Sequence, residues 1–135
     1  MKNLCIITTS TQSISSFLKK YIHEFSKKDI NITLVSNFHK NQKNFVNIDF
    51  VKDYKNVKIH HIPFDRKPNL YLDIISLIKL INFFRNNNFD MFFSLTPKAG
   101  FISSIAGTFS NIKHRIHIFT GQVWYTKKGL IKIIL

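Results

Sequence analysis

Continuous apolar runs alternate along this chain with segments in which apolar side chains recur every three or four positions. Residues 3–8 and 30–36 are runs of the first kind, typical of strands that are covered on both faces of a sheet. The segment between them has helical spacing and predicts a helix with one buried face. Its apolar positions are Ile14, Phe17, Leu18, Tyr21, Ile22 and Phe25. Strand, helix and strand in this order predict a βαβ unit.

The second half of the chain repeats the alternation. We expect strands at 57–62, 89–95 and 115–119, and helices at 70–86 and from Pro97 to about Phe109. Asn69 is expected to cap the helix at 70–86, with Asp73 in its first turn, where the helix dipole favours a carboxylate. That helix is apolar almost all round, so we expect it to lie deep in the packing. The whole pattern predicts an α/β fold, a Rossmann-like parallel sheet with helices on both faces.

Composition bounds the class of protein. The 135 residues, 44% of them hydrophobic and 14% aromatic, fit one globular domain over residues 1–135. Cys5 is the only cysteine, which excludes a disulfide framework and suits a reducing compartment; in a buried strand we interpret it as an inert core residue. The N-terminus lacks the features of a signal peptide, and polar residues interrupt the most apolar stretch, 70–84. The apolar ending at 130–135 favours a chain truncated within a larger protein.

The formal net charge of +13, from 20 basic and 7 acidic residues, attracts anions. Anionic lipid headgroups, diphosphates and nucleic acids are all compatible with it. Taken singly, the lysines are interpreted as ordinary solvated surface. Because the chain has no recognised RNA or DNA motif, a nucleic-acid-binding protein is the least favoured hypothesis.

The first candidate site is the start of the helix after the fourth predicted strand. Thr96 is expected to cap this helix through its hydroxyl, with Pro97 at the first helical position. The free N–H groups of the first turn and the charge of Lys98 then favour an anion, while Ala99 and Gly100 leave room for a ligand to approach the backbone. The glycine spacing of a P-loop or dinucleotide site is absent. An ordinary helix start is the alternative interpretation.

The second candidate site is the loop after the fifth predicted strand. Thr120 and Gln122 are expected at the same sheet end as Lys98, and Gly121 permits a positive φ or a close substrate. Gln122 offers a donor and an acceptor for sugar hydroxyls, and Trp124 a flat apolar face for a sugar ring or a membrane interface. The alternative is that Trp124 fills the core and Gln122 serves the turn.

The remaining titratable residues define no catalytic constellation. No histidine pair has zinc-ligand spacing with a supporting carboxylate, and no nucleophile elbow or Ser-His-Asp order is present. His117 is a candidate to contact a phosphate together with Lys98, although a structural or surface role is favoured. We therefore assign no catalytic residue and no metal site.

Three segments resemble the N-terminal domain of bacterial GT-B glycosyltransferases of family 4, whose members build capsule, lipopolysaccharide O-antigen and related surface glycans. They are KNLCIITTSTQSISSFLKKYIHEF at 2–25, VKIHHIPFDRKPNLYLDIISLIKLINFFRNNNFDMFFSLTPKAG at 57–100, and HRIHIFTGQVW at 114–124. TPKAG and RIHIFTGQVW carry the most specific part of the likeness, which covers nearly the whole chain.

The resemblance implies a retaining enzyme that transfers sugar from a nucleotide-diphosphate donor to an acceptor, often lipid-linked, with no cofactor or required metal. The donor is expected to bind a second, C-terminal Rossmann-like domain with paired glutamates, which these 135 residues lack. This half then supplies acceptor recognition, in the cytoplasm at the inner face of the cytoplasmic membrane. Many relatives carry a catalytic histidine where this chain has Thr120, so only a substrate contact is carried over. The implied acceptor-side residues are Thr96, Lys98, Ala99, Gly100, His117, Thr120, Gly121, Gln122 and Trp124.

A second hypothesis is a non-catalytic acceptor- or membrane-binding subunit that docks on a separate catalytic chain. An exposed apolar patch would support it, and a polar surface across the sheet ends would count against it.

Overall fold

The computed structural model describes residues 2–41 and 44–119. The strands are β1 (Lys2–Ile7), β2 (Ile30–Ser36), β3 (Val57–His61), β4 (Met91–Ser94) and β5 (His114–His117). The helical elements are α1 (Thr11–Ser13), the π-helical turn η1 (Ile14–Leu18), α2 (Lys19–Ser26), the 3-10 turn η2 (Asp49–Asp53), α3 (Leu70–Arg85) and α4 (Pro97–Phe109). Each predicted strand is therefore present, within two residues of its expected bounds.

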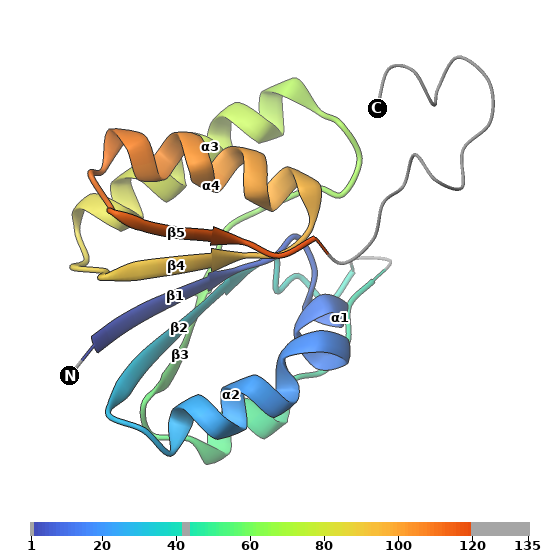
Figure 1. The fold of residues 1–135 in the computed structure, drawn as a ribbon. Coiled ribbons are helices and arrows are strands. Elements are labelled where there is room, and N and C mark those ends of the chain that lie inside the picture. Colours follow the sequence, from blue (N-terminus) through green and yellow to red (C-terminus); the bar gives the residue numbers. More distant parts are fainter. Residues whose placement is uncertain (1, 42–43, 120–135) are drawn as a thin grey trace.

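All five strands are parallel and lie in the order β3-β2-β1-β4-β5. The chain first moves outward from β1 to β3, then returns to the other side of β1 and continues outward through β4 and β5 (Figure 1). This is the doubly wound Rossmann-like arrangement, and the direction of winding reverses between β1 and β4. The predicted fold class is confirmed.

Helices cover both faces of the sheet, with α3 and α4 on one face and α1 and α2 on the other (Figure 1). Successive side chains of β1 point to opposite faces of the sheet, so they pack in different layers. Cys5 and Ile7 belong to the core cluster beneath α3 and α4, whereas Leu4 and Ile6 belong to the cluster beneath α2 and η2. This double coverage explains the unbroken apolar run. Burial raises the pKa of the Cys5 thiol, in agreement with an inert core residue.

Helix α4 approaches the sheet closely because of its two glycines. A Cβ added at Gly107 would lie 2.6 Å from the ring of Phe92, and one at Gly100 would lie 2.5 Å from the ring of His117. Real Cβ atoms do not come this close to other heavy atoms, so a side chain at either position would require the Phe92 or His117 ring to shift. The two glycines therefore set how closely α4 approaches the sheet.

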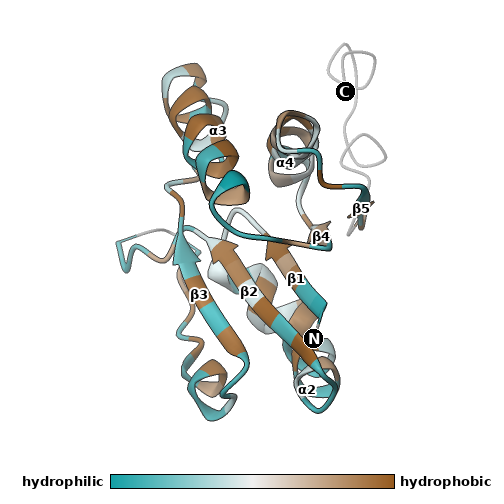
Figure 2. Ribbon diagram, turned by 90° about the vertical axis from the view of Figure 1, so that its left-hand side faces the viewer, coloured by the Kyte–Doolittle hydropathy of each residue, from teal (hydrophilic) through white to brown (hydrophobic). Residues whose placement is uncertain are grey.

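Helix α3 departs from the prediction, because it is not buried all round. Its buried residues are Ser76, Leu80 and Phe84. Its outer face exposes Leu70 (78%), Tyr71 (74%), Ile74 (48%) and Ile78 (53%). Figure 2 shows the brown of hydrophobic residues over much of α3. One side of a helix in an outer layer packs on the sheet. The apolar composition of α3 did not indicate that its other side is exposed to solvent. No helix in the described ranges is long and apolar enough to cross a bilayer.

The helix after β1 was predicted as one regular element, but it contains the π-helical turn η1. Ile14, Leu18 and Ile22 are buried as expected. Phe17 and Tyr21, expected on the same face, are 52% and 58% exposed. A π turn has more residues per turn than an α-helix, so it changes which side chains face the core.

Candidate functional site

The sheet edge at the winding reversal is the place where open α/β sheets bind ligands. At this edge, the residues after β1 are polar yet buried: Thr8, Thr9 and Ser10. The Thr8 hydroxyl lies 2.8 Å from the Ser10 carbonyl oxygen and 3.2 Å from the hydroxyl of Ser36 at the end of β2. These two contacts hold the Thr8 side chain between the backbone of Ser10 and the end of β2, so the residues after β1 have a fixed position at the edge.

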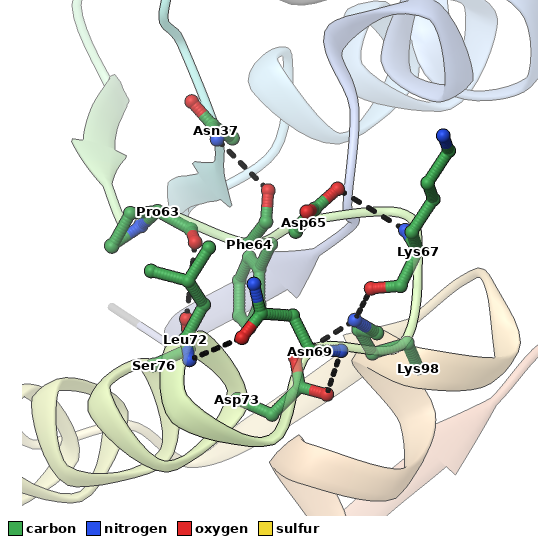
Figure 3. Close-up of polar contacts among 10 residues, drawn as sticks. All are labelled: Asn37, Pro63, Phe64, Asp65, Lys67, Asn69, Leu72, Asp73, Ser76 and Lys98. Atoms are coloured by element: carbon green, nitrogen blue, oxygen red, sulfur yellow. Dashed lines mark hydrogen bonds and ion pairs between the residues drawn. The ribbon is translucent and has the colours of Figure 1, made fainter.

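Residues 63–69, here called the strap, run along the same edge from the end of β3 to the start of α3 (Figure 3). The Asn37 amide donates to the Phe64 carbonyl over 2.8 Å. The Asp65 carboxylate accepts the N–H of Lys67 over 3.1 Å, which holds a tight turn. The strap is thus tied both to β2 and to itself.

The strap ends in the predicted cap of α3. The Asn69 side chain accepts the Leu72 N–H over 3.2 Å, and the Asp73 carboxylate accepts the Asn69 N–H over 3.3 Å. This reciprocal arrangement satisfies donors that would otherwise lack a partner at the helix start. The prediction for Asn69 and Asp73 is confirmed.

Lys98 closes the strap onto α4 and does not present a free charge. Its ammonium lies 2.8 Å from the Asp73 carboxylate and also donates to the carbonyl of Lys67. The side chains of Lys98 and Asp73 are only 15% and 26% exposed. Figure 3 shows the ammonium between the strap and the first turn of α3. The expectation of an uncompensated positive charge at this helix start is wrong, because Asp73 balances it.

Thr96 does not cap α4 through its hydroxyl, so this part of the prediction is wrong. Its φ is +54° and ψ is 134°, and the side chain makes no capping hydrogen bond. Pro97 occupies the first helical position as predicted, and it favours an extended ψ at the residue before it. The Thr96 Oγ1 atom is buried and has no partner in the described structure. A β-branched residue at positive φ costs on the order of 1–3 kcal/mol.

Ala99 and Gly100 do not leave room for a ligand. Ala99 is fully buried in the core, and the ring of His117 fills the space beside Gly100. The His117 Nδ1 lies 3.0 Å from the Ser94 hydroxyl. Positions 98 and 100 of a helix point about 200° apart, so Lys98 faces α3 while His117 packs on the other flank of α4. The structure does not bring Lys98 and His117 together on one phosphate.

The second candidate site, with Thr120, Gly121, Gln122 and Trp124, lies outside the described residues. The pocket that these residues were expected to form with Lys98 therefore stays a prediction.

The histidines at the end of β3 have structural contacts. His60 stacks on Phe83 with ring centroids 3.8 Å apart, and the Nδ1 of His61 accepts the Phe38 N–H over 3.1 Å. Burial lowers the pKa of both imidazoles, and the charge of His39 lowers that of His61 further. Among residues 2–41 and 44–119, no cluster of three or more His, Cys, Asp or Glu side chains could hold a metal ion.

Two cavities lie away from this edge, on either side of Tyr54. One encloses about 410 Å³ between mostly apolar side chains of the segment that connects β2 to β3. The other encloses about 440 Å³ against η1 and α2 and has basic and aromatic walls. The second cavity was not predicted from the sequence, because lysines taken singly are interpreted as solvated surface.

Comparison with known proteins adds a relative. No protein-family model matches the chain. Over 136 aligned residues, which include all of this chain, it is 33% identical to the capsular polysaccharide biosynthesis glycosyltransferase CapM of Staphylococcus aureus. The chain spans about a third of the length of that protein (33%).

Among solved structures, the chain is similar to the C-terminal domain of a hydrogenase from Pyrococcus furiosus. The TM-score is 0.51, and the match covers 87% of this chain and 90% of the other at 10% identity. At so low an identity the likeness concerns the fold alone, and it agrees with the Rossmann-like α/β architecture.

Proposed function

We propose that this chain is the acceptor-side domain of a glycosyltransferase that acts in the synthesis of a capsule-type cell-surface polysaccharide. The observation that carries the proposal is the 33% identity to CapM along the whole chain. The fold supports it, because a doubly wound sheet presents one wall of a ligand crevice at its winding reversal.

The finer features of the proposal follow the resemblance to GT-B enzymes of family 4. We infer a nucleotide-diphosphate sugar as donor, a glycan or lipid-linked acceptor, retention of configuration and no required metal. The donor would bind mainly to a second domain or a partner chain. The excess of basic residues supports a position at the inner, anionic face of the cytoplasmic membrane.

The role of the described edge is to position and not to transfer protons. The Thr8 hydroxyl and the Asn37 amide are already hydrogen-bonded within the protein, and the strap is held by Asp73 and Lys98. Because this wall is already ordered, it loses little conformational entropy when a substrate binds. The polar loop at 120–124, with Thr120, Gln122 and Trp124, remains the proposed source of direct acceptor contacts.

A chimera tests the proposal. Residues 1–135 replace the matching third of CapM, and the purified protein is assayed with radiolabelled nucleotide sugars and bacterial lipid extracts. We expect a labelled product with retained anomeric configuration by NMR, formed equally well with EDTA. A folded chimera that binds a nucleotide sugar but transfers nothing to any acceptor would contradict the proposal.

One observation favours the alternative of a separate, non-catalytic subunit. The outer face of α3 exposes Leu70, Tyr71, Ile74 and Ile78, a surface suited to a partner chain. The same CapM remainder, supplied as a second polypeptide, separates the two possibilities. Activity in trans would favour the subunit, whereas activity only in the fused chimera would favour the domain.

A further inference from the structure

A groove with basic and aromatic walls is lined by residues of η1 and α2 and by Tyr54. The helices α1 and α2 cover the face of the sheet opposite α3 and α4 (Figure 1). The groove encloses about 440 Å³, within the size range of small-molecule sites. Its lining residues are Ser16, Phe17, Lys19, Lys20, His23 and Tyr54.

The π-helical turn contributes the aromatic wall of this groove. Phe17 lies within η1 and is 52% exposed, although its neighbour Leu18 is buried in the core. An exposed phenylalanine is costly in water, and single π turns inside helices occur frequently at functional sites. The ring is therefore available to stack on a ligand.

The opposite wall is held in place by contacts between segments distant in the sequence. The His23 Nδ1 lies 2.8 Å from the Tyr54 hydroxyl, and the two rings meet edge to face. The Lys19 ammonium lies 5.3 Å from the centroid of the Phe50 ring, in a cation–π contact. These contacts join α2 to η2 and the residue that follows it, so the groove has defined sides.

The charge of the groove is unbalanced. Within the described ranges, three lysines pair with carboxylates: Lys27 with Glu24, Lys52 with Asp49, and Lys98 with Asp73. Neither Lys19 nor Lys20 forms such a pair in this part of the chain. The groove consequently holds two positive charges that an anionic ligand would neutralise.

We propose that this groove binds a small anionic sugar unit, such as a sugar phosphate. The exposed ring of Phe17 suits the apolar face of a sugar, the ammonium groups of Lys19 and Lys20 suit its phosphate, and Ser16 and Tyr54 offer hydroxyls for its oxygens. A nucleic-acid strand needs a longer track of aromatic and basic groups than this single cavity provides. The site is separate from the winding-reversal edge, so it goes beyond the proposed function.

The test is a titration of the purified chain with glucose 1-phosphate, followed by NMR chemical shifts and calorimetry. We expect saturable shifts at Phe17, Lys19 and Lys20, weaker binding of inorganic phosphate at the same residues, and no binding of neutral glucose. The double variant Lys19→Gln/Lys20→Gln should weaken binding about tenfold or more. The control Lys27→Gln/Lys28→Gln, just beyond the C-terminal end of the same helix, should bind like the parent.

Three results would overturn the inference. They are equal weakening in both double variants, shifts that map away from the groove, and tighter binding of a short oligonucleotide with a steeper salt dependence. Because all four lysines are exposed, the variants should keep the parent's circular dichroism and melting temperature. Binding is measured without any transfer reaction, so failure here is distinct from failure of the CapM chimera.

Discussion

The two helical layers of this protein differ in how their side chains pack and in whether carboxylates balance the charges of their lysines. On the face of α3 and α4, glycines let α4 press against the sheet, and the charge of Lys98 is balanced by Asp73. On the face of α1 and α2, a π turn exposes Phe17, and Lys19 and Lys20 have no carboxylate partner in the described structure. A lysine is thus structural on the first face and available for a ligand on the second.

This comparison indicates where ligand-binding side chains are expected in such a fold. The edge at the winding reversal is pre-formed by internal hydrogen bonds, so it can define the shape of a crevice without presenting much charge. The groove keeps its charge and its apolar ring exposed, so it can attract and stack on an anion.

Gly107→Ala should lower the free energy of unfolding by about 1–2 kcal/mol, because overpacking against Phe92 outweighs the gain in helix propensity. Urea unfolding measures this, and Phe92→Leu in the same chain should restore part of the loss. Gly100→Ala should cost less, since the half-buried His117 ring can move aside. A Gly107→Ala variant at least as stable as the parent would contradict the close packing of this layer.

A double-mutant cycle on Lys98→Met and Asp73→Asn should give a coupling free energy of about 1 kcal/mol, because the pair is largely shielded from water. The exposed pair Lys27 and Glu24, 57% and 55% accessible, is the matched control and should give about 0–0.5 kcal/mol. Equal coupling in the two cycles would show that Lys98 is not a structural lysine.

Stability should fall at acidic pH in part because of the histidines at the end of β3. The pKa values of His60 and His61 are lowered in the native state from 6.5, so the folded chain prefers the neutral imidazoles. Their contribution is complete above pH 6.5 and is lost as the pH falls through the native pKa values. In urea unfolding between neutral and mildly acidic pH, His61→Gln should flatten this dependence. An unchanged slope would contradict the assignment.

Lys19→Gln/Lys20→Gln should lower the free energy of unfolding by at most about 1 kcal/mol, because both lysines are exposed and neither forms an ion pair in the described residues. An exposed cation–π contact such as that of Lys19 with Phe50 contributes about 0.5–1 kcal/mol. The measurement is the same urea titration, with Lys27→Gln/Lys28→Gln in parallel. A marked loss of stability in the first variant alone would mean that the groove lysines hold the fold together.

Local patterns predicted much of this fold. The pattern of apolar residues predicted the position of each described strand. The cap of α3 by Asn69, with Asp73 in the first turn, could be predicted because these residues lie close together in the sequence. The failures involve contacts that sequence spacing does not carry. The Lys98 partner lies 25 positions away, and Pro97 together with the positive φ of Thr96 removed the expected cap. The outer face of α3 has an apolar composition that does not distinguish burial from exposure.

The candidate site was predicted only in outline. The winding of the parallel sheet agrees with the predicted fold and determines the edge at which the site was expected, and the site itself stays a prediction. The groove beside Phe17 was not predicted, because a regular helical spacing of apolar residues does not indicate a π turn.

The most direct test of the account is sugar transfer by the fused chimera of residues 1–135 with the remaining two thirds of CapM. We expect label to move from a nucleotide sugar to a lipid-extract acceptor, above the level given by that CapM remainder alone. A folded chimera that still binds the donor and yields no product with any acceptor would contradict it.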